Sequence, residues 1–369
     1  MSRWAWAEVD LSAVRANVEH MVAVAAPAVV WAVVKADGYG HGASQASRAA
    51  LQGGATGLCV ALAQEGIALR DSGLDCPILV LSEQPPSELA GAIRAGLDLT
   101  VYSYAQLEDI ASAGGRDHPV HLKVDTGMHR VGAAAHDAVG LADAIDESAA
   151  ARLAGLCTHL AVADEPADAF NAAQIAAFED VLTALTAAGH HPPLVHAANS
   201  AATLANPSAH FDMVRAGISI YGISPGAAVV PHTAALRPAL SLRARVSHVK
   251  QVRAGAGISY GLQHRFERDT VVATLPLGYA DGVPRRLFSC GGEVLIGGRR
   301  RSIVGVVTMD QLMVDCGTED VAVGDEAVLI GSQGSDSIKA DEWADRLGTI
   351  GYEVVCGISN RIERRYTAA

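Results

Sequence analysis

The stretch VVWAVVKADGYGHG, residues 29–42, decides the fold of the first part of the chain. It opens with a valine-rich apolar run, which is typical of a β-strand buried on both faces. Lys35 and a glycine-rich turn that contains Tyr39 follow directly. Strands buried on both faces belong to parallel sheets covered by helices, so the segment predicts the first strand–helix unit of an α/β domain.

Similar short apolar runs recur after it, each followed by a polar or glycine residue and then by an alanine-rich stretch with helical periodicity. The runs lie at residues 29–38, 56–61, 77–82, 99–103, 120–127, 153–161, 193–200 and 212–222. Eight such units in roughly 200 residues suit a closed (β/α)8 barrel, and a doubly wound sheet is the main alternative.

Polar residues at the ends of the runs favour the barrel. Each stands at or just beyond the carboxyl end of a run: Lys35, Lys123, Asp125, His159, Asn199, Ser200 and Arg215. In a barrel the carboxyl ends of all strands form one mouth, so these side chains would meet there. We therefore predict a TIM barrel over residues 1–230 with its site at that mouth.

After residue 230 the pattern changes to alternating runs such as LSLRARVSHVKQV (240–252) and TVVATLPLG (270–278), separated by glycine-rich turns. Few stretches there have helical periodicity, so residues 231–369 are predicted to form a mostly-β domain. Residues 5–11, AWAEVDL, also alternate like a strand but precede the first barrel unit. They are therefore candidates for the second domain.

Composition narrows the class of protein. The net charge of −12 argues against a nucleic-acid partner, because polyanion surfaces are usually met with an excess of Lys and Arg. The six cysteines include no C-x-x-C pair, which indicates reduced thiols in a cytoplasmic protein. No apolar run is long enough to span a bilayer, and the amino terminus lacks the features of a secretory signal. No histidine pair has metal-ligand spacing, so no metal is expected.

Lys35 is the residue whose position suggests chemistry. A lysine at the mouth of an apolar barrel is desolvated, and desolvation supplies the neutral amine that forms an imine with a carbonyl compound. The alternative is a lysine at a strand end whose ammonium group reaches water. The segment taken alone supports the two interpretations equally.

The same segment resembles the cofactor-lysine motif of the alanine racemase family. Other stretches resemble that family's motifs in order along nearly the whole chain: HLKVDTGMHRVG (121–132), THLAVADE (158–165), HAANSAATL (196–204), RAGISIYGISP (215–225), ISYG (258–261), PLGYADGVPR (276–285), VVTMDQLMVD (306–315) and GYEVVC (351–356). One such match is weak evidence, whereas the ordered set is strong.

The resemblance implies an isomerase that interconverts L-alanine and D-alanine, with Lys35 joined to pyridoxal phosphate through an imine. The cofactor acts as an electron sink, while the protein places one base on each face of Cα. By resemblance, Lys35 takes the D-alanine proton and Tyr260 the L-alanine proton. A free phenol has a pKa near 10, and the family places the residues matching His159 and Arg215 beside that tyrosine. The product D-alanine would supply peptidoglycan.

The resemblance also assigns the rest of the site. Arg215 hydrogen-bonds the pyridine nitrogen; Ser200, Gly217 and Ile218 bind the phosphate, with hydroxyls from Tyr39 and Tyr352. Arg130 contacts the phenolic oxygen of the cofactor and the substrate carboxylate, beside Lys123, which is frequently carbamylated in the family. Met309 and Asp310 close the substrate pocket, and Tyr279 lines its mouth.

Simpler interpretations exist for three of these residues. Ser200 precedes AATLA, where a helix N-cap is expected. Arg215 fits a surface salt bridge, and Met309 fits a core position. One position departs from the family: His129 stands where glycine is usual, which puts the placement of Arg130 and of a carbamate on Lys123 in doubt.

Other functions of the same general class remain open at this point. A broader-specificity racemase, for serine or other amino acids, shares all these motifs. A decarboxylase with the same domains would place a carboxylate at the pyridine nitrogen and lack the Tyr260 motif, and a non-catalytic pyridoxal-phosphate carrier would consist of the barrel alone. Because Tyr260 lies in the second domain and must reach a barrel mouth, the family resemblance predicts a homodimer with shared active sites.

Overall fold

The structure is a computed structural model that describes residues 4–367. Its contacts divide the chain into two compact units. One contains the described residues up to Ala13 together with those from Pro238 onward, and the other runs from Val14 to Arg237. The division thus follows Arg237, whereas the sequence placed a domain boundary after residue 230.

The unit from Val14 to Arg237 is a parallel β-barrel. Its strands are β2 (Val29–Val33), β3 (Gly57–Val60), β4 (Ile78–Val80), β5 (Asp98–Val101), β6 (His118–Asp125), β8 (Ala151–Cys157), β9 (Leu194–His196) and β10 (Met213–Ala216). Each overlaps one of the eight apolar runs of the sequence, although β5, β6 and β8 begin one or two residues before theirs. They are ordered β10-β2-β3-β4-β5-β6-β8-β9, which follows the chain in one direction instead of reversing as in a doubly wound sheet. The barrel prediction is therefore confirmed, and the doubly wound alternative is wrong.

The barrel is nearly closed at the seam between its first and last strands in this order. Asp212 N donates to Val195 O at 3.0 Å, and Arg215 N donates to Ala198 O at 3.0 Å. These bonds join the segments of β9 and β10 although no regular ladder pairs them. The short strand β7 (Ala133–Ala134) pairs with the end of β6.

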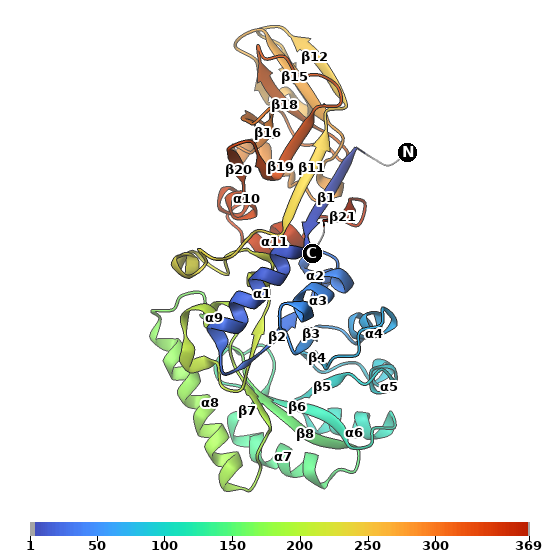
Figure 1. Cartoon of the computed structure of the whole chain (residues 1–369), viewed down its shortest axis with the longest axis vertical. Helices are drawn as coiled ribbons and strands as arrows, with labels where there is room; N and C mark the ends of the chain where they lie inside the picture. The colour runs from blue at the N-terminus through green and yellow to red at the C-terminus, as the bar shows by residue number, and fades with distance from the viewer. Residues whose placement is uncertain (1–3, 368–369) are drawn as a thin grey trace. The chain divides into compact units, whose positions relative to one another are not determined.

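Helices surround the parallel strands (Figure 1). They are α1 (Leu11–Ala25), the short α2 (Lys35–Tyr39), α3 (Ala43–Gln52), α4 (Ala63–Asp71), α5 (Pro86–Arg94), α6 (Tyr104–Ser112), α7 (Ala138–Glu147), α8 (Ala169–Ala187) and α9 (Ser200–Ala205). Small polar residues begin several of them by accepting a backbone N–H bond, as Ser103 does for α6 and Asp168 for α8. Apolar side chains from strands and helices form the core between them.

The second unit is mostly β, as the sequence predicted. One sheet has the order β17-β16-β19-β11-β1-β21 with β20 paired to β19, and a separate sheet has the order β12-β15-β18. The strands are β1 (Ala5–Asp10), β11 (Leu240–Arg245), β12 (His248–Val252), β13 (Gly257–Ile258), β14 (His264–Arg265), β15 (Thr270–Leu275), β16 (Glu293–Ile296), β17 (Arg299–Ser302), β18 (Leu312–Gly317), β19 (Glu326–Gln333), β20 (Asp336–Ile338) and β21 (Glu363–Thr367). Two helices, α10 (Ala340–Leu347) and α11 (Gly351–Cys356), complete the unit.

The alternating stretch near the amino terminus forms β1 of this second unit. It pairs antiparallel with β11 and parallel with β21. Its alternation of buried and partly buried residues reflects a strand between two neighbours rather than a barrel strand. No helix within residues 4–367 is long and apolar enough to cross a membrane.

Candidate active site

Lys35 follows β2 directly and begins a turn with an unusual backbone. Ala36, Asp37, Gly38 and Tyr39 all have positive φ, between 52° and 63°. Such conformations cost about 1 kcal/mol or more for each residue that has a Cβ atom. The turn is therefore a strained segment that the surrounding structure must hold in place.

Two carboxylates support this turn. Glu65, on α4, accepts a hydrogen bond from Ala36 N at 2.7 Å through Oε1 and one from Ala61 N at 2.8 Å through Oε2. Asp37 accepts one from Ala43 N, at the start of α3, at 2.9 Å. Glu65 belongs to none of the motifs quoted from the sequence. Its only local signal is its place in the first turn of a predicted helix.

Tyr39 is buried at the end of the same turn. Its ring lies 5.3 Å from that of Tyr221, whose hydroxyl donates to Val33 O at 3.1 Å. A Cβ atom added to Gly217 would lie only 2.8 Å from the Tyr39 hydroxyl oxygen. The absence of a side chain at Gly217 therefore lets the Tyr39 hydroxyl approach the backbone that follows β10.

Donors converge on Ser200. Its Oγ accepts hydrogen bonds from Gly217 N at 2.8 Å, Ser219 N at 3.3 Å and Ser219 Oγ at 2.9 Å. The helix N-cap expected at Ser200 is instead Asn199, whose extended backbone lets its side chain accept from Ala202 N. Ser200 is thus the first residue of α9, and its hydroxyl faces the loop after β10.

Arg215 lies inside the barrel, with only 5% of its surface exposed, so the surface salt bridge considered from the sequence is wrong. Nη1 donates to His196 Nδ1 at 2.5 Å, and Nη2 donates to Thr158 O at 2.9 Å and to His159 Nδ1 at 3.2 Å. Burial lowers the pKa of the guanidinium, although Arg normally remains charged. Within residues 4–367, no carboxylate forms an ion pair with it.

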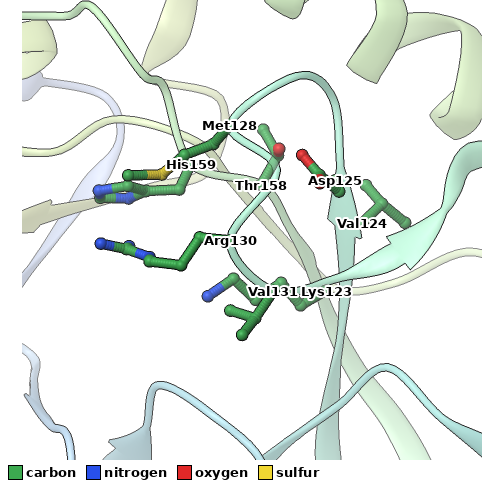
Figure 2. A pocket seen from close by; sticks show the side chains of 8 residues that line it. All are labelled: Lys123, Val124, Asp125, Met128, Arg130, Val131, Thr158 and His159. Carbon is green, nitrogen blue, oxygen red and sulfur yellow. The ribbon is translucent and has the colours of Figure 1, made fainter.

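Lys123, Arg130 and His159 line one pocket at the ends of β6 and β8, together with Val124, Asp125, Met128, Val131 and Thr158. Figure 2 shows the Arg130 guanidinium and the His159 imidazole extending to the same side of that pocket. Burial and then the positive charges of Arg215 and Arg130 lower the pKa of His159 well below its usual value. His159 is therefore a neutral imidazole.

Lys123 is also buried, and its Nζ donates to Leu81 O at 3.3 Å. Burial is the main cause that lowers the pKa of its amine, and the positive charges of Arg215 and Arg130 act in the same direction. A lysine so placed is a better nucleophile at neutral pH than a solvated one, because more of it is unprotonated.

His129 has a positive φ of 55°. This conformation favours glycine, which gives a physical reason for the family's usual residue there. The strain is partly offset by Asp125, which accepts a hydrogen bond from His129 N at 3.1 Å. The His129 ring itself is exposed, with Nδ1 3.3 Å from Asp125 Oδ2. The departure from glycine is therefore accommodated within the loop before Arg130.

Tyr260 belongs to the second unit and has 71% of its surface exposed. It stands on a turn in which Ser259, Gly261 and Leu262 have positive φ. The Ser259 hydroxyl donates to Val306 O at 2.8 Å and anchors that turn. Tyr260 also lines an open pocket of about 510 Å³ within this unit.

Three further predicted residues lie on neighbouring loops of the second unit. Tyr279 N donates to Thr308 O, and Ala280 N donates to Met309 O, so the loops that carry Tyr279 and Met309 are adjacent. Met309 is 53% exposed, which makes the core position considered from the sequence wrong. Asp310 accepts a hydrogen bond from Arg361 Nη2 at 2.6 Å.

The predicted residues thus fall into two groups. The barrel unit holds Lys35, Tyr39, Lys123, Arg130, His159, Ser200, Arg215, Gly217 and Ile218, whereas the second unit holds Tyr260, Tyr279, Met309, Asp310 and the half-buried Tyr352 on α11. Within residues 4–367, no cluster of three or more His, Cys, Asp or Glu side chains is arranged to hold a metal ion.

Comparisons with known proteins match the chain along its length. The family model for the alanine racemase N-terminal domain matches residues 9–225, and that for the alanine racemase C-terminal domain matches residues 239–366. The chain belongs to the alanine racemase family.

Individual relatives of the racemase agree with this assignment. The chain is 46% identical to an alanine racemase of Frankia casuarinae over 98% of this chain and 95% of that protein. It is 44% identical to one of Thermobifida fusca over the full length of both. The solved alanine racemase of Streptomyces lavendulae superposes with a TM-score of 0.94 at 37% identity, covering 100% of this chain and 98% of that one.

Alanine racemases depend on pyridoxal phosphate, and the barrel mouth of this racemase fits that group. Gly217 leaves space that a Cβ atom would fill, and its N–H belongs to the cluster of donors around Ser200. Backbone N–H groups and hydroxyls of this kind bind phosphate without a nearby cation. Lys35 supplies an amine at the same mouth, and Arg215 supplies a buried donor that cannot accept a proton.

We predict that Gly217→Ala weakens cofactor binding. The new methyl group would displace the Tyr39 hydroxyl, so the apparent dissociation constant for pyridoxal phosphate should rise roughly tenfold in a fluorescence titration of the apo-racemase. Gly91→Ala, on α5, is the matched control, since the nearest atom to its new Cβ is the movable Cδ1 of Ile67 at 3.3 Å. Equal binding by the two variants would contradict the steric argument.

Proposed function

We propose that this alanine racemase interconverts L-alanine and D-alanine with two bases, Lys35 and Tyr260, acting on opposite faces of Cα. The observation that carries the proposal is the group of side chains at the barrel mouth, in which Lys35 accompanies a buried Arg215 and a donor-rich Ser200 loop. Pyridoxal phosphate, when bound, supplies an electron sink that makes the Cα proton of alanine acidic. The chain supplies the proton acceptors and the geometry.

The phosphate of the cofactor would be held by Ser200, Gly217 and Ile218, with hydroxyls from Tyr39 and Tyr352. The hydrogen bonds that now end on Ser200 Oγ come from donors that a phosphate oxygen can take over. Arg215 would donate to the pyridine nitrogen. Because a guanidinium keeps its proton, it leaves that nitrogen unprotonated, which distinguishes this site from one with a carboxylate at the same position.

His159 supports this arrangement through its tautomer. Arg215 can only donate, so His159 Nδ1 must accept, and the single proton of the neutral ring then sits on Nε2. A ring held in this state is a hydrogen-bond donor through Nε2. We propose that it donates to the phenol oxygen of Tyr260, which helps the phenolate form at lower pH than in a free tyrosine.

Arg130 would bind the substrate carboxylate and the phenolic oxygen of the cofactor. Met309, Asp310 and Tyr279 would narrow the substrate pocket, and a narrow pocket favours alanine over amino acids with larger side chains. Serine differs from alanine by one hydroxyl group, so a racemase of broader specificity is the nearest alternative. The ratio of kcat/KM for alanine and serine separates the two. A carrier made of the barrel alone is not supported, because the family model for the alanine racemase C-terminal domain also matches residues 239–366.

Lys123 is proposed to carry a carbamate. A protonated Lys123 would put a second cation in the pocket of Arg130, which burial and the neighbouring positive charges disfavour, whereas a carbamate on Lys123 would orient Arg130 by accepting from it. We predict density for a carboxylate on Nζ in a crystal structure grown with bicarbonate, together with a carbamate signal in the ¹³C spectrum of protein incubated with labelled bicarbonate. A bare ammonium with no anion beside it would contradict the proposal.

The two bases make a prediction that depends on the isomer of alanine. Tyr260→Phe removes the base for the L-alanine proton and leaves Lys35 in place. The variant should therefore still exchange the Cα proton of D-alanine with deuterated solvent, while exchange from L-alanine and racemisation fall by a factor on the order of 10³. Proton NMR of each isomer in D₂O measures this. Tyr104→Phe, an exposed tyrosine on α6, should behave as wild type; equal losses for both isomers in Tyr260→Phe would overturn the assignment.

We propose a homodimer in which each active site takes Lys35 from one subunit and Tyr260 from its partner. The support is the exposure of Tyr260, Tyr279 and Met309 on one unit, since large apolar side chains rarely stay exposed in groups. We further propose a cytoplasmic location, supported by six cysteines that form no disulfide, and a role for the D-alanine in peptidoglycan synthesis.

Mixing two inactive variants tests the shared site. Lys35→Ala and Tyr260→Phe subunits, unfolded and refolded together in equal amounts, should regain on the order of a quarter of wild-type activity, because half of the dimers are mixed and one of their two sites is intact. Each variant refolded alone is the control. A mixture no more active than the separate variants would show that Tyr260 acts within its own subunit or not at all.

A further inference from the structure

Arg215 is a buried cation that forms no ion pair with a carboxylate of residues 4–367. Its guanidinium donates to backbone carbonyl oxygens of Thr158 and Ala197 and to two imidazole nitrogens, those of His196 and His159. Desolvating a charge costs several kcal/mol unless its donors are all satisfied. The acceptors that surround Arg215 therefore determine where the guanidinium can lie.

His196 is the acceptor with a second partner in the barrel core. Its Nδ1 accepts from Arg215, so the ring proton must be on Nε2, and Nε2 lies 2.9 Å from Nδ1 of His121. His121 Nδ1 must then accept, and its own proton is on Nε2. Among the described residues that Nε2 has no hydrogen-bond partner, and the nearby Asp98 Oδ2 lies 3.7 Å away. Because arginine can only donate, it fixes one direction for the hydrogen bonds, from Arg215 to His196 to His121.

The fold makes specific room for this chain. A Cβ atom on Gly155 of β8 would lie 2.3 Å from His121 Nδ1, so only glycine lets the ring reach across β8 from β6 to β9. The pairing of β6 with β8 also shifts register between Val120 and His121, opposite Gly155. Gly155 does not have a positive φ, so space rather than backbone conformation explains its presence. Both features indicate that the His121 ring has a defined place.

We propose that His196 and His121 are positioning residues for racemisation: as neutral imidazoles, they form a one-way hydrogen-bond chain that holds the Arg215 guanidinium in place without neutralising it. The proposal rests on the proposed role of Arg215 at the cofactor ring. A carboxylate in the place of His196 would pair with Arg215 and weaken its positive charge at the barrel mouth. An imidazole acceptor holds the same geometry and leaves that charge available.

The tautomers of the two rings test the chain directly. Holoenzyme labelled with ¹⁵N only in histidine gives long-range ¹H–¹⁵N spectra that distinguish the two neutral tautomers from the imidazolium, with resonances assigned from His121→Phe and His196→Gln. Each ring should carry its proton on Nε2, as the hydrogen bonds from Arg215 to His196 and from His196 to His121 require. An imidazolium, or a proton on Nδ1 of either ring, would overturn the proposal. If one variant fails to fold, the other still assigns its own ring in the wild-type spectrum, and a proton on Nδ1 of that ring alone is enough to overturn the proposal.

Kinetics separate positioning from a merely structural role. His196→Leu removes the acceptor for Arg215 and should lower kcat/KM roughly tenfold or more per bound cofactor, with a shifted visible absorption band. His196→Gln keeps an amide oxygen that can accept from Arg215. It should therefore restore most of the kcat/KM and bring the absorption band back toward its wild-type position. His118→Asn is the control. His118 is also a buried histidine on β6, but its ring bonds Leu97 O and takes no part in the hydrogen bonds that lead to Arg215.

The outcomes distinguish the two proposals. If wild-type holoenzyme fails to racemise alanine, the proposed function fails, whatever the tautomers are. If wild type is active and His196→Leu matches it in kcat/KM and absorption band, or if His196→Gln is no better than His196→Leu, the positioning chain is wrong while the function stands. If His118→Asn loses as much kcat/KM as His196→Leu, the positioning chain is also wrong, because the loss would then come from general disturbance of the packing.

Discussion

The burial of one positive charge constrains the centre of this protein. Arg215 projects from β10 into a largely apolar barrel core that also holds His121 and His196, where a guanidinium is tolerated only when its donors have acceptors. Those acceptors come from the carboxyl ends of β8 and β9 and from two imidazole rings. Closure of the barrel brings these strand ends together. The same hydrogen bonds therefore join the strand ends and hold the guanidinium of Arg215.

Backbone strain is the second constraint, and it occurs in the same form at both proposed bases. Lys35 begins a turn of residues with positive φ, and Tyr260 lies within another. Each turn has a side chain that stabilises it, Glu65 in the first and Ser259 in the second. Positive φ at residues other than glycine persists only where neighbours enforce it, and such sites are often functional. The two turns therefore fix the direction in which each base is presented.

The sequence predicted the barrel because its signal is local. Each of the eight apolar runs overlaps a strand, and the polar residues that end the runs lie at the mouth. Contacts between distant residues had no such signal. Ser200 precedes a helix and looked like its cap, yet Asn199 has the extended backbone that capping requires. His196 had no role assigned from the sequence, because nothing local indicates that Arg215, 19 residues later, donates to it.

The overall composition does not indicate that the barrel mouth is positively charged, because that charge also depends on contacts between residues distant in the sequence. A net charge of −12 describes the whole chain, whereas the barrel mouth gathers Lys123 of β6, Arg130 of the loop after β6 and Arg215 of β10 within one region. Their mutual repulsion, together with burial, lowers the pKa of Lys123 and of His159, so the region sheds protons that it would otherwise carry. The positive potential that lowers these pKa values also attracts anions. Phosphate, a substrate carboxylate and a carbamate are all anions. The same excess of positive groups therefore explains why three chemically different groups are expected at one barrel mouth.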